Sequence, residues 1–415
     1  MISRSALAVA LWRWRRRERG AIAYGQVESF RSDTSRVNSE NLVCKLKLLK
    51  RTPPNLFAIP FGLAGLASVW RLMAVFYGTP GAISDGLFVV AAAVWLSLAA
   101  AGLGKLIRAP RTIRAELRDP VLSPFWSLPS ISGMVLCIGL APHAYGVAKV
   151  GFVVFYIATF LFAGWIAGEW IAMPLDAHKF HPGYVLPTAA GGLLAAEGAA
   201  EFGLPGLGWL SFGFGIVSFA GLSALVLNRL LFLKMREAPL VPGLIFLVAP
   251  PAIAGTAYFE LHGAVAGPFE YGLAGWTVFM LIVWFRLLPN LWRAGFTAGF
   301  WSLTFSWSAI ALFAIRWLHI EHPAGETVYA ALALGGVTLL IGAIAGWSLL
   351  AIARGQFLPP VPAIPLETEA PLARGAPPAA ARSASPGDAS GKRRGTALER
   401  SRPATNDIAH QRRDP

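Results

Sequence analysis

Charge is scarce in this chain of 415 residues: Asp, Glu, Lys and Arg together make up 14% of it, whereas a soluble domain carries about 25%. Apolar residues make up 55% of the sequence, and the mean hydropathy is +0.55. These values exclude an ordinary cytosolic enzyme, an intrinsically disordered chain and a small secreted domain held by disulfides. They are typical of a polytopic α-helical membrane protein.

Cysteine and the usual catalytic patterns are also scarce. The two cysteines, Cys44 and Cys137, lie far apart and form no CxxC, no zinc-ligand spacing and no disulfide framework. The sequence contains no P-loop, no HExxH motif and no Ser/His/Asp constellation. His178 and His181 lie close together beside Asp176, but no further metal ligand is near them. We therefore predict that the protein is not an enzyme and has no catalytic residue, metal or cofactor.

The excess of positive charge, +14 overall, is concentrated at the two ends of the chain. Residues 1–54 contain 12 Lys and Arg against 4 Asp and Glu, and residues 354–415 contain 10 against 6. A basic tail beside a membrane domain more often contacts anionic headgroups than nucleic acid, so we expect membrane lipids and no nucleic acid as partners. We predict that 1–54 is a disordered cytoplasmic extension, with a misassigned translation start as the alternative. The Pro/Ala/Arg-rich segment 354–415 is predicted to be a disordered tail.

Residues 55–353, between these tails, are predicted to form one transmembrane domain. A membrane-spanning helix needs about 20 mostly apolar residues. Short connections join ten such stretches, at 55–77, 83–107, 121–141, 146–170, 183–203, 206–233, 240–261, 268–288, 296–318 and 326–352. The predicted fold class is an all-α polytopic membrane protein of ten transmembrane helices, in which consecutive helices are antiparallel neighbours.

The distribution of basic residues predicts which ends of these helices are cytoplasmic. Eleven basic residues follow the even-numbered stretches, namely Lys105, Arg108, Arg111, Arg114, Arg118, Lys179, Arg229, Lys234, Arg236, Arg286 and Arg293. The turns on the opposite side contain none. Cytoplasmic loops carry an excess of Lys and Arg. Both termini of a ten-helix chain are therefore predicted to be cytoplasmic.

Proline alternates along the predicted helices. The odd-numbered stretches contain Pro60, Pro124, Pro129, Pro187, Pro250 and Pro251, and the interiors of the even-numbered ones contain none. Proline removes a backbone hydrogen bond and kinks a helix, and in a bilayer the freed carbonyl must face protein or a water-filled cavity. The alternation favours five helical hairpins whose odd helices face something other than lipid. The ninth stretch breaks the pattern because it has no proline.

Small and ionisable residues within the stretches leave two interpretations open. The glycines Gly62, Gly65, Gly133 and Gly191 either let helices approach closely or widen a path between them. Arg71 and Arg316, near outer helix ends, either extend to the membrane surface or attract anions in a vestibule. Glu197 and Glu201 are expected to pair with a basic group or to face the vestibule rim. The alternative for Glu197 is that it binds a proton in coupled transport.

Several motifs make the chain resemble a known family. They are FAIPFGLAGLASVWR at 57–71, RDPVLSPFWSLP at 118–129, YVLPTAAGG at 184–192, FRLLPNLW at 285–292 and FTAGFWSLTFSWSAIAL at 296–312. Over residues 54–353 the chain is similar to the tellurite-resistance/dicarboxylate transporter family, which includes bacterial TehA-type proteins and the slow anion channels of plant guard cells. The resemblance implies a homotrimer in a bacterial inner membrane, with a separate pore in each protomer.

The resemblance also implies roles for particular residues. Odd helices would ring the pore, even helices would surround them, and a phenylalanine of the ninth helix would block the path. The matching residue is Phe305, with Phe300 as its rival. Residues implied to line or shape the pore are Pro60, Gly62, Gly65, Pro129, Gly133, Pro187, Gly191, Pro250 and Thr304.

These features together predict a membrane channel or passive transporter for inorganic or small organic anions. One alternative is a proton-coupled carrier of C4-dicarboxylates, sulfite or tellurite-related anions. An alternative of another class is a membrane signalling scaffold that docks partners on its tails.

Overall fold

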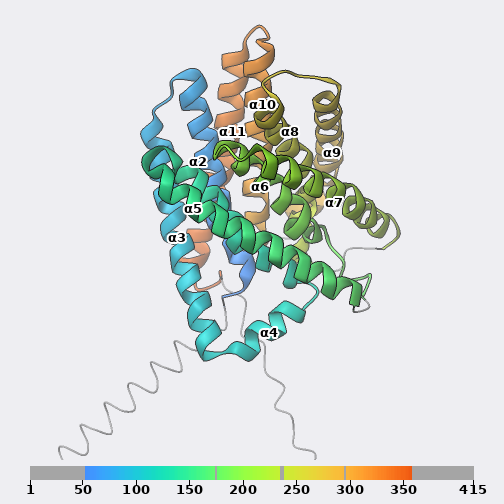
Figure 1. The fold of residues 1–415 in the computed structure, drawn as a ribbon. Helices are drawn as coiled ribbons and strands as arrows, with labels where there is room; N and C mark the ends of the chain where they lie inside the picture. Colours follow the sequence, from blue (N-terminus) through green and yellow to red (C-terminus); the bar gives the residue numbers. More distant parts are fainter. Residues whose placement is uncertain (1–51, 173–174, 234–237, 294–295, 358–415) are drawn as a thin grey trace, which may run out of the picture. The chain divides into compact units, whose positions relative to one another are not determined.

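A computed structural model of the chain describes residues 52–172, 175–233, 238–293 and 296–357, and these residues form helices and connections without a β-strand. The predictions made for the two tails therefore fall almost entirely outside the described residues. The principal α-helices are α2 (Ala58–Tyr77), α3 (Gly81–Arg108), α4 (Pro110–Arg118), α5 (Leu128–Ala172), α6 (Gly191–Glu201), α7 (Pro205–Phe232), α8 (Ala249–His262), α9 (Pro268–Arg293), α10 (Trp301–Glu321) and α11 (Glu326–Ala353) (Figure 1).

Eight helical segments among the described residues are long and apolar enough to cross a membrane, which confirms the all-α membrane class. The third and fourth predicted stretches form one of these segments, because α5 runs from one into the other. Ala144, with φ −151° and ψ 66°, interrupts the helix just after Pro142 and divides it into two arms. The fifth stretch is built from shorter pieces, η3 (Pro182–Val185), η4 (Leu186–Ala190) and the 11-residue α6.

Every odd-numbered stretch begins with an irregular helical turn before its α-helix starts. A 3-10 helix precedes four of them: η1 (Pro54–Phe57) before α2, η2 (Ser123–Ser127) before α5, η5 (Ala238–Leu247) before α8, and η6 (Ala298–Phe300) before α10. The 3-10 helix η3 and the π-helix η4 precede α6. Among the described residues, α3, α7, α9 and α11 have no such leading turn. The odd stretches therefore share a structural form, and the ninth has it without a proline.

The prolines occupy these starts, and the predicted kinks within the odd helices are wrong. Pro60 is the third residue of α2, Pro129 the second of α5, Pro187 the second of η4, and Pro250 the second of α8. The first N–H groups of a helix have no intrahelical acceptor, so proline loses nothing there. Helix α9 is longer than the predicted eighth stretch, 268–288, and continues through Pro289 to Arg293.

Burial separates the helices into two sets. In α8 and α10, 78% and 67% of the apolar segment is buried, whereas in α3 and α9 only 11% and 17% is. We call α2, the first arm of α5, α6, α8 and α10 the inner helices, and the others the outer helices. The outer helices expose large apolar side chains such as Val89, Leu161 and Leu339, which suits a surface that contacts lipid tails.

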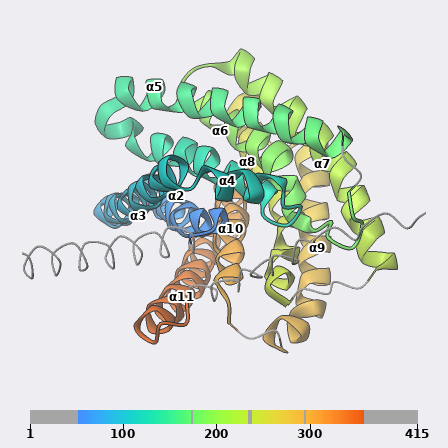
Figure 2. The same ribbon diagram turned by 90° about the horizontal axis from the view of Figure 1, so that it is seen from below.

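The inner helices contact one another in a closed order. α2 contacts α5, α5 contacts α6, α6 contacts α8, α8 contacts α10, and α10 contacts α2 again. Each of α2, α6, α8 and α10 also contacts the outer helix that follows it in the sequence. Figure 2, which views the bundle from below, shows α3, α7, α9 and α11 toward the outside of this arrangement.

The connection between α3 and α5 was predicted to be a turn, but it contains the nine-residue helix α4. Lys105, counted above among the cytoplasmic charges, is instead buried, with 1% of its surface exposed. Its Nζ donates to Glu116 Oε1 of α4 at 2.8 Å and to the carbonyl of Thr52 at 2.7 Å. One buried ammonium thus ties together the end of α3, α4 and the residues that precede η1.

The tightest helix contact lies between α2 and α10. A Cβ atom added to Gly62 would overlap the side chain of Thr304, and one added to Gly65 would lie 2.9 Å from the Phe305 ring and from Ser308 Cβ. Glycine is therefore required at Gly62 because the neighbouring helix already fills the space of a side chain. The structure thus favours the close-packing interpretation for Gly62 and Gly65.

We predict that Gly62→Val destabilises the folded protein by about 2 kcal/mol or more, because the new side chain must displace Thr304. The measurement is the thermal midpoint of the detergent-solubilised protein. Gly86→Val is the matched control, since Gly86 lies on the outer helix α3 with no neighbouring atom within 4 Å of an added Cβ. Equal midpoints for the two variants would contradict the packing argument.

Candidate functional site

The leading turns of the five inner helices surround one pocket of about 170 Å³. Its walls come from all five odd-numbered stretches: Asn55 and Ala58, then Val121, Leu122 and Phe125, then His181, then Gly243 and Phe246, and finally Ala298, Gly299 and Ser302. Because these residues are far apart in the sequence, the pocket exists only through the convergence of the inner helices. We call it the inner pocket.

The lining of the inner pocket is apolar with a few hydrogen-bonding groups and no carboxylate. Asn55 Oδ1 and Ser302 Oγ are buried and have no hydrogen-bond partner among the described residues. The other lining side chains are alkyl groups, aromatic rings and the imidazole of His181. Such a lining offers an ion few contacts and no repelling negative charge.

His181 is an uncharged part of the wall. Burial lowers the pKa of His181 to about 4. Its Nδ1 accepts from the backbone N–H of Gly183 at 3.1 Å, and its Nε2 lies 3.1 Å from the carbonyl of Val121, which it can reach only as the donor. Both ring nitrogens are therefore satisfied in the neutral form. His181 joins the start of the fifth stretch to the start of the third and gives the pocket no fixed positive charge at neutral pH.

Two aromatic rings lie about one helical turn beyond the inner pocket. Phe305 follows Ser302 along α10, and Phe61 follows Ala58 along α2. Their rings are stacked, with centroids 3.5 Å apart and planes 9° from parallel. Phe305 is 6% exposed and Phe61 3%. The two rings therefore fill the space between α2 and α10 directly beyond the pocket.

The other side chains of this part of α10 point elsewhere. Thr304 is fully buried, and its Oγ1 donates to the carbonyl of Trp301 at 2.7 Å. Phe300, the rival candidate, packs on Phe296 with ring centroids 5.3 Å apart. Trp307 contacts Trp284 of the outer helix α9. Among these residues, Phe305 is the one stacked on Phe61.

An ionic cluster lies farther along the inner helices. Arg316 of α10 donates to Glu260 of α8, with 2.6 Å between Nη2 and Oε1. Glu197 and Glu201 of α6 are near enough to interact electrostatically with Glu260. Glu197 also interacts with Arg316. Arg316 is thus paired within the bundle, and acidic side chains outnumber it.

Arg71 holds two helices together. Its guanidinium donates to the carbonyls of Ile138 and Gly139 in the first arm of α5, at 2.9 and 2.5 Å. It also lies over the Phe88 ring of α3, 4.6 Å from the ring centroid. The structure therefore gives Arg71 structural contacts, and its predicted vestibule role stays a prediction.

The remaining residues predicted to line or shape a pore are contacts between helices. The space beside Gly133 is filled by the Phe155 ring at 2.8 Å, and the space beside Gly191 by Thr159 at 2.9 Å. The carbonyl of Pro129 accepts from Trp95 Nε1 at 3.0 Å. Pro60, Pro187 and Pro250 are buried in the first turns of their helices. These residues position the inner helices without lining the inner pocket.

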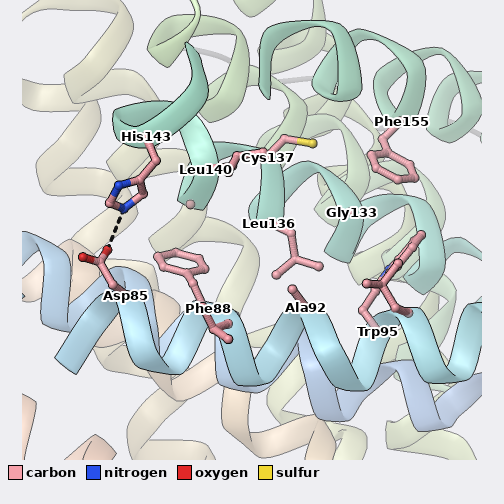
Figure 3. Close-up of a pocket in the computed structure, with 13 residues that line it drawn as sticks. Asp85, Phe88, Ala92, Trp95, Gly133, Leu136, Cys137, Leu140, His143 and Phe155 are labelled. Carbon is pink, nitrogen blue, oxygen red and sulfur yellow. Dashed lines mark hydrogen bonds and ion pairs between the residues drawn. The ribbon is translucent and has the colours of Figure 1, made fainter. Parts of the chain in front are cut away.

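A second cavity of about 320 Å³ has a different character (Figure 3). It lies between α3 and both arms of α5, and its lining is apolar except at one end, where His143 Nε2 and Asp85 Oδ1 are 3.0 Å apart. Exposed side chains such as Val89 and Leu140 form part of its wall. This cavity opens on the outer surface and does not reach the convergence of the five inner helices.

Several residues of the site were not predicted. Asn55, Ser302 and Phe61 carried no separate signal, because an isolated polar or aromatic residue in an apolar stretch is common. Glu260 had a usable signal, since an ionisable residue within a membrane helix needs a partner. Its partner Arg316 lies on another helix, so the pairing required the three-dimensional structure.

Comparison with known proteins agrees with this architecture. Residues 51–353 match the model of the SLAC1 family, described as voltage-dependent anion channels. The chain is 25% identical to the tellurite resistance protein TehA homolog of Haemophilus influenzae over 312 residues, which are 74% of this chain and 92% of that protein. It is 23% identical over 316 residues to the S-type anion channel SLAH3 of Arabidopsis thaliana, covering 72% of this chain and 48% of that channel.

The resemblance predicted from the motifs is confirmed by these matches. The family match covers the transmembrane domain from before η1 to the end of α11 and leaves both tails outside. It therefore includes every residue of the inner pocket, the stacked phenylalanines and the ionic cluster. The chain is a membrane protein that belongs to the voltage-dependent anion channel (SLAC1) family.

Proposed function

We propose that the protein is an anion channel or passive anion transporter whose path follows the common axis of the five inner helices. The inner pocket is one vestibule of this path, and Phe305, stacked on Phe61, is the plug. The observation that carries the proposal is that residues at the starts of all five odd-numbered stretches line a single pocket, with an aromatic stack about one helical turn beyond it. The apolar cavity between α3 and α5 lacks both features.

The inner pocket suits anions for two physical reasons. The odd-numbered stretches all begin around it, so the positive ends of their helix dipoles are directed toward it. Its lining contains no carboxylate, while Ser302 and Asn55 supply side-chain donors. Such contacts are weak enough to release an ion, which conduction requires.

The ionic cluster supports proton-coupled transport as a second candidate function. Glu197 and Glu260 interact with Arg316, and Glu201 interacts with Arg71, so three carboxylates lie beside two arginines. Excess carboxylates in a buried site are sites for proton binding, and they would oppose an anion unless protonated. A carrier would use this cluster to couple anion and proton movement, whereas a channel would not depend on a proton gradient.

We expect Phe305→Ala to raise anion conductance about tenfold or more, which corresponds to a barrier lower by ~1.4 kcal/mol. Removing the ring opens the space beside Phe61, while alanine preserves the helix. The measurement is chloride current through purified protein in planar bilayers. Phe61→Ala should give a smaller increase, because it removes the partner ring and leaves the proposed plug.

Phe300→Ala is the matched control, because it removes the same ring from the same stretch but away from the stack. The gate assignment is wrong if Phe305→Ala assembles normally and conducts no more than the parent, or if Phe300→Ala conducts as much. Current that is insensitive to a pH gradient supports the channel. Saturating uptake that requires a proton gradient supports the carrier.

We infer that the ends of the inner helices at the inner pocket face the cytoplasm. Cysteines introduced at Ala82 and Glu321 should react with impermeant thiol reagents applied to intact cells, and one at Ala115 of α4 should not. All three positions are exposed in the structure. A difference in labelling would therefore report the side of the membrane and not the burial of the cysteine. Labelling of position 115 from outside would reverse the orientation.

We propose a homotrimer with a separate path in each protomer, on the strength of the family resemblance. The extensive apolar surface of the outer helices is available for contacts between protomers or with lipid. Native mass spectrometry should give three times the 44.4 kDa chain mass, plus bound lipid. A single-chain mass under conditions that preserve activity would contradict the trimer.

A further inference from the structure

Helix α4 presents an arginine face away from the protein. Arg111, Arg114 and Arg118 are exposed, and their spacing places them on one side of a helix with 3.6 residues per turn. Ile113 and Glu116, on the opposite side, are buried. Arg108 at the end of α3 is exposed as well. We call these four arginines the α4 arginine face.

These guanidinium groups differ from three other arginines of the transmembrane domain, Arg71, Arg229 and Arg316. Arg71 is held by backbone carbonyls and Arg316 by Glu260, and Arg229 donates to the carbonyls of Ala177 and His178. Within the described ranges, no ion pair or side-chain hydrogen bond engages the α4 arginine face. Its positive charge is therefore not neutralised by a neighbouring carboxylate of those ranges.

The arginine face is held in place by the buried contact between α3 and α4. The side chains of Lys105 and Glu116 are only 2% and 11% exposed, and Lys105 also donates to Thr52. Burial raises the pKa of the Glu116 carboxyl, while its hydrogen bond to Lys105 acts in the opposite direction. Because Ile113 packs on the same side, α4 cannot turn its arginines inward without breaking an ion pair shielded from water.

The arginine face lies at the mouth of the inner pocket. The chain leaves α4 at Arg118, and Val121 and Leu122 of the next turn line the pocket. Asp119 Oδ1 accepts from the N–H groups of Val121 and Leu122 at 2.8 and 3.0 Å, which fixes this connection. Figure 1 places α4 at the lower end of the bundle, and α4 contacts η2, one of the leading turns around the pocket.

We propose that the α4 arginine face is an anion-collecting surface, which concentrates small permeant anions at the inner pocket before they enter the path. This inference rests on the proposed anion path and adds the site from which that path is supplied. Charges of one sign at the mouth of a low-dielectric cavity raise the local concentration of counter-ions and the rate of their entry. Exposed charges act over about 10 Å at 0.1 M salt, and the range shrinks at higher salt.

The neighbouring charges leave this surface positive. The described carboxylates of this segment are Glu116, which is paired with Lys105, and Asp119, which is bonded to two backbone N–H groups. His181 of the pocket wall is uncharged at neutral pH. The four exposed arginines therefore outnumber Asp119, the one carboxylate of this segment that is not buried.

The test uses the full chain in the Phe305→Ala background, in planar bilayers of neutral phosphatidylcholine. Arg111→Gln/Arg114→Gln/Arg118→Gln should lower chloride conductance about threefold or more in symmetric 20 mM chloride. The difference should disappear in 1 M chloride, where the Debye length is about 3 Å. The loss should be larger at the voltage polarity that drives anions from the α4 side.

Two matched variants separate charge from structure. Arg286→Gln/Arg354→Gln removes two exposed cations from the ends of other even stretches, and it should retain parental conductance. Arg111→Lys/Arg114→Lys/Arg118→Lys should also retain it, because the proposed role needs charge and not guanidinium geometry. Unchanged conductance of the triple glutamine variant at 20 mM chloride would overturn the proposal.

The outcomes also distinguish this surface from its alternatives. A loss of the same size at both salt concentrations, or a loss shared by the lysine variant, would make the arginines structural and overturn the proposal. A loss that appears only after anionic lipid is added would assign them to headgroup binding instead. If the Phe305→Ala background itself carries no anion current, the proposed function fails before the arginine face is tested.

Discussion

The need to satisfy backbone polar groups inside a bilayer is the constraint on which this structure depends. Irregular backbone is tolerated at membrane depth only where protein or a cavity covers it. The five inner helices each begin with such backbone, and all five beginnings meet at the inner pocket. The outer helices, which expose large apolar side chains, are regular from their first turns. The position of the pocket thus follows from where the chain departs from α-helical geometry.

The sequence predicted the helices well and their junctions less well. Apolar length located all ten stretches, because hydrophobic runs report directly on membrane burial. The proline alternation identified the inner helices correctly, although the prolines mark helix starts and not kinks. Helix α4 was missed because its arginines resemble an ordinary cytoplasmic turn. Lys105 was counted among surface charges because its partner, Glu116, lies on a different helix.

The candidate site could be predicted only in part, because its residues meet across different helices. Phe305 came from a motif, and the structure adds that its ring is stacked on Phe61. Gly62 was predicted with two open roles, and contact with Thr304 favours packing. The inner pocket was not predictable at all, since it joins single residues from five separate stretches. Periodicity describes one helix at a time and carries no information on which faces meet.

The close contact between α2 and α10 limits how the stacked rings can separate. Gly62 already touches Thr304 one residue away from Phe305, so the two backbones have no room to move closer or to slide past one another without a clash. Displacement of the Phe305 ring by rotation about its own side-chain bonds needs no such movement of the helices. Side-chain rotation is intrinsically much faster than collective helix motion. The timescale on which the proposed path opens is therefore set by the packing around one side chain.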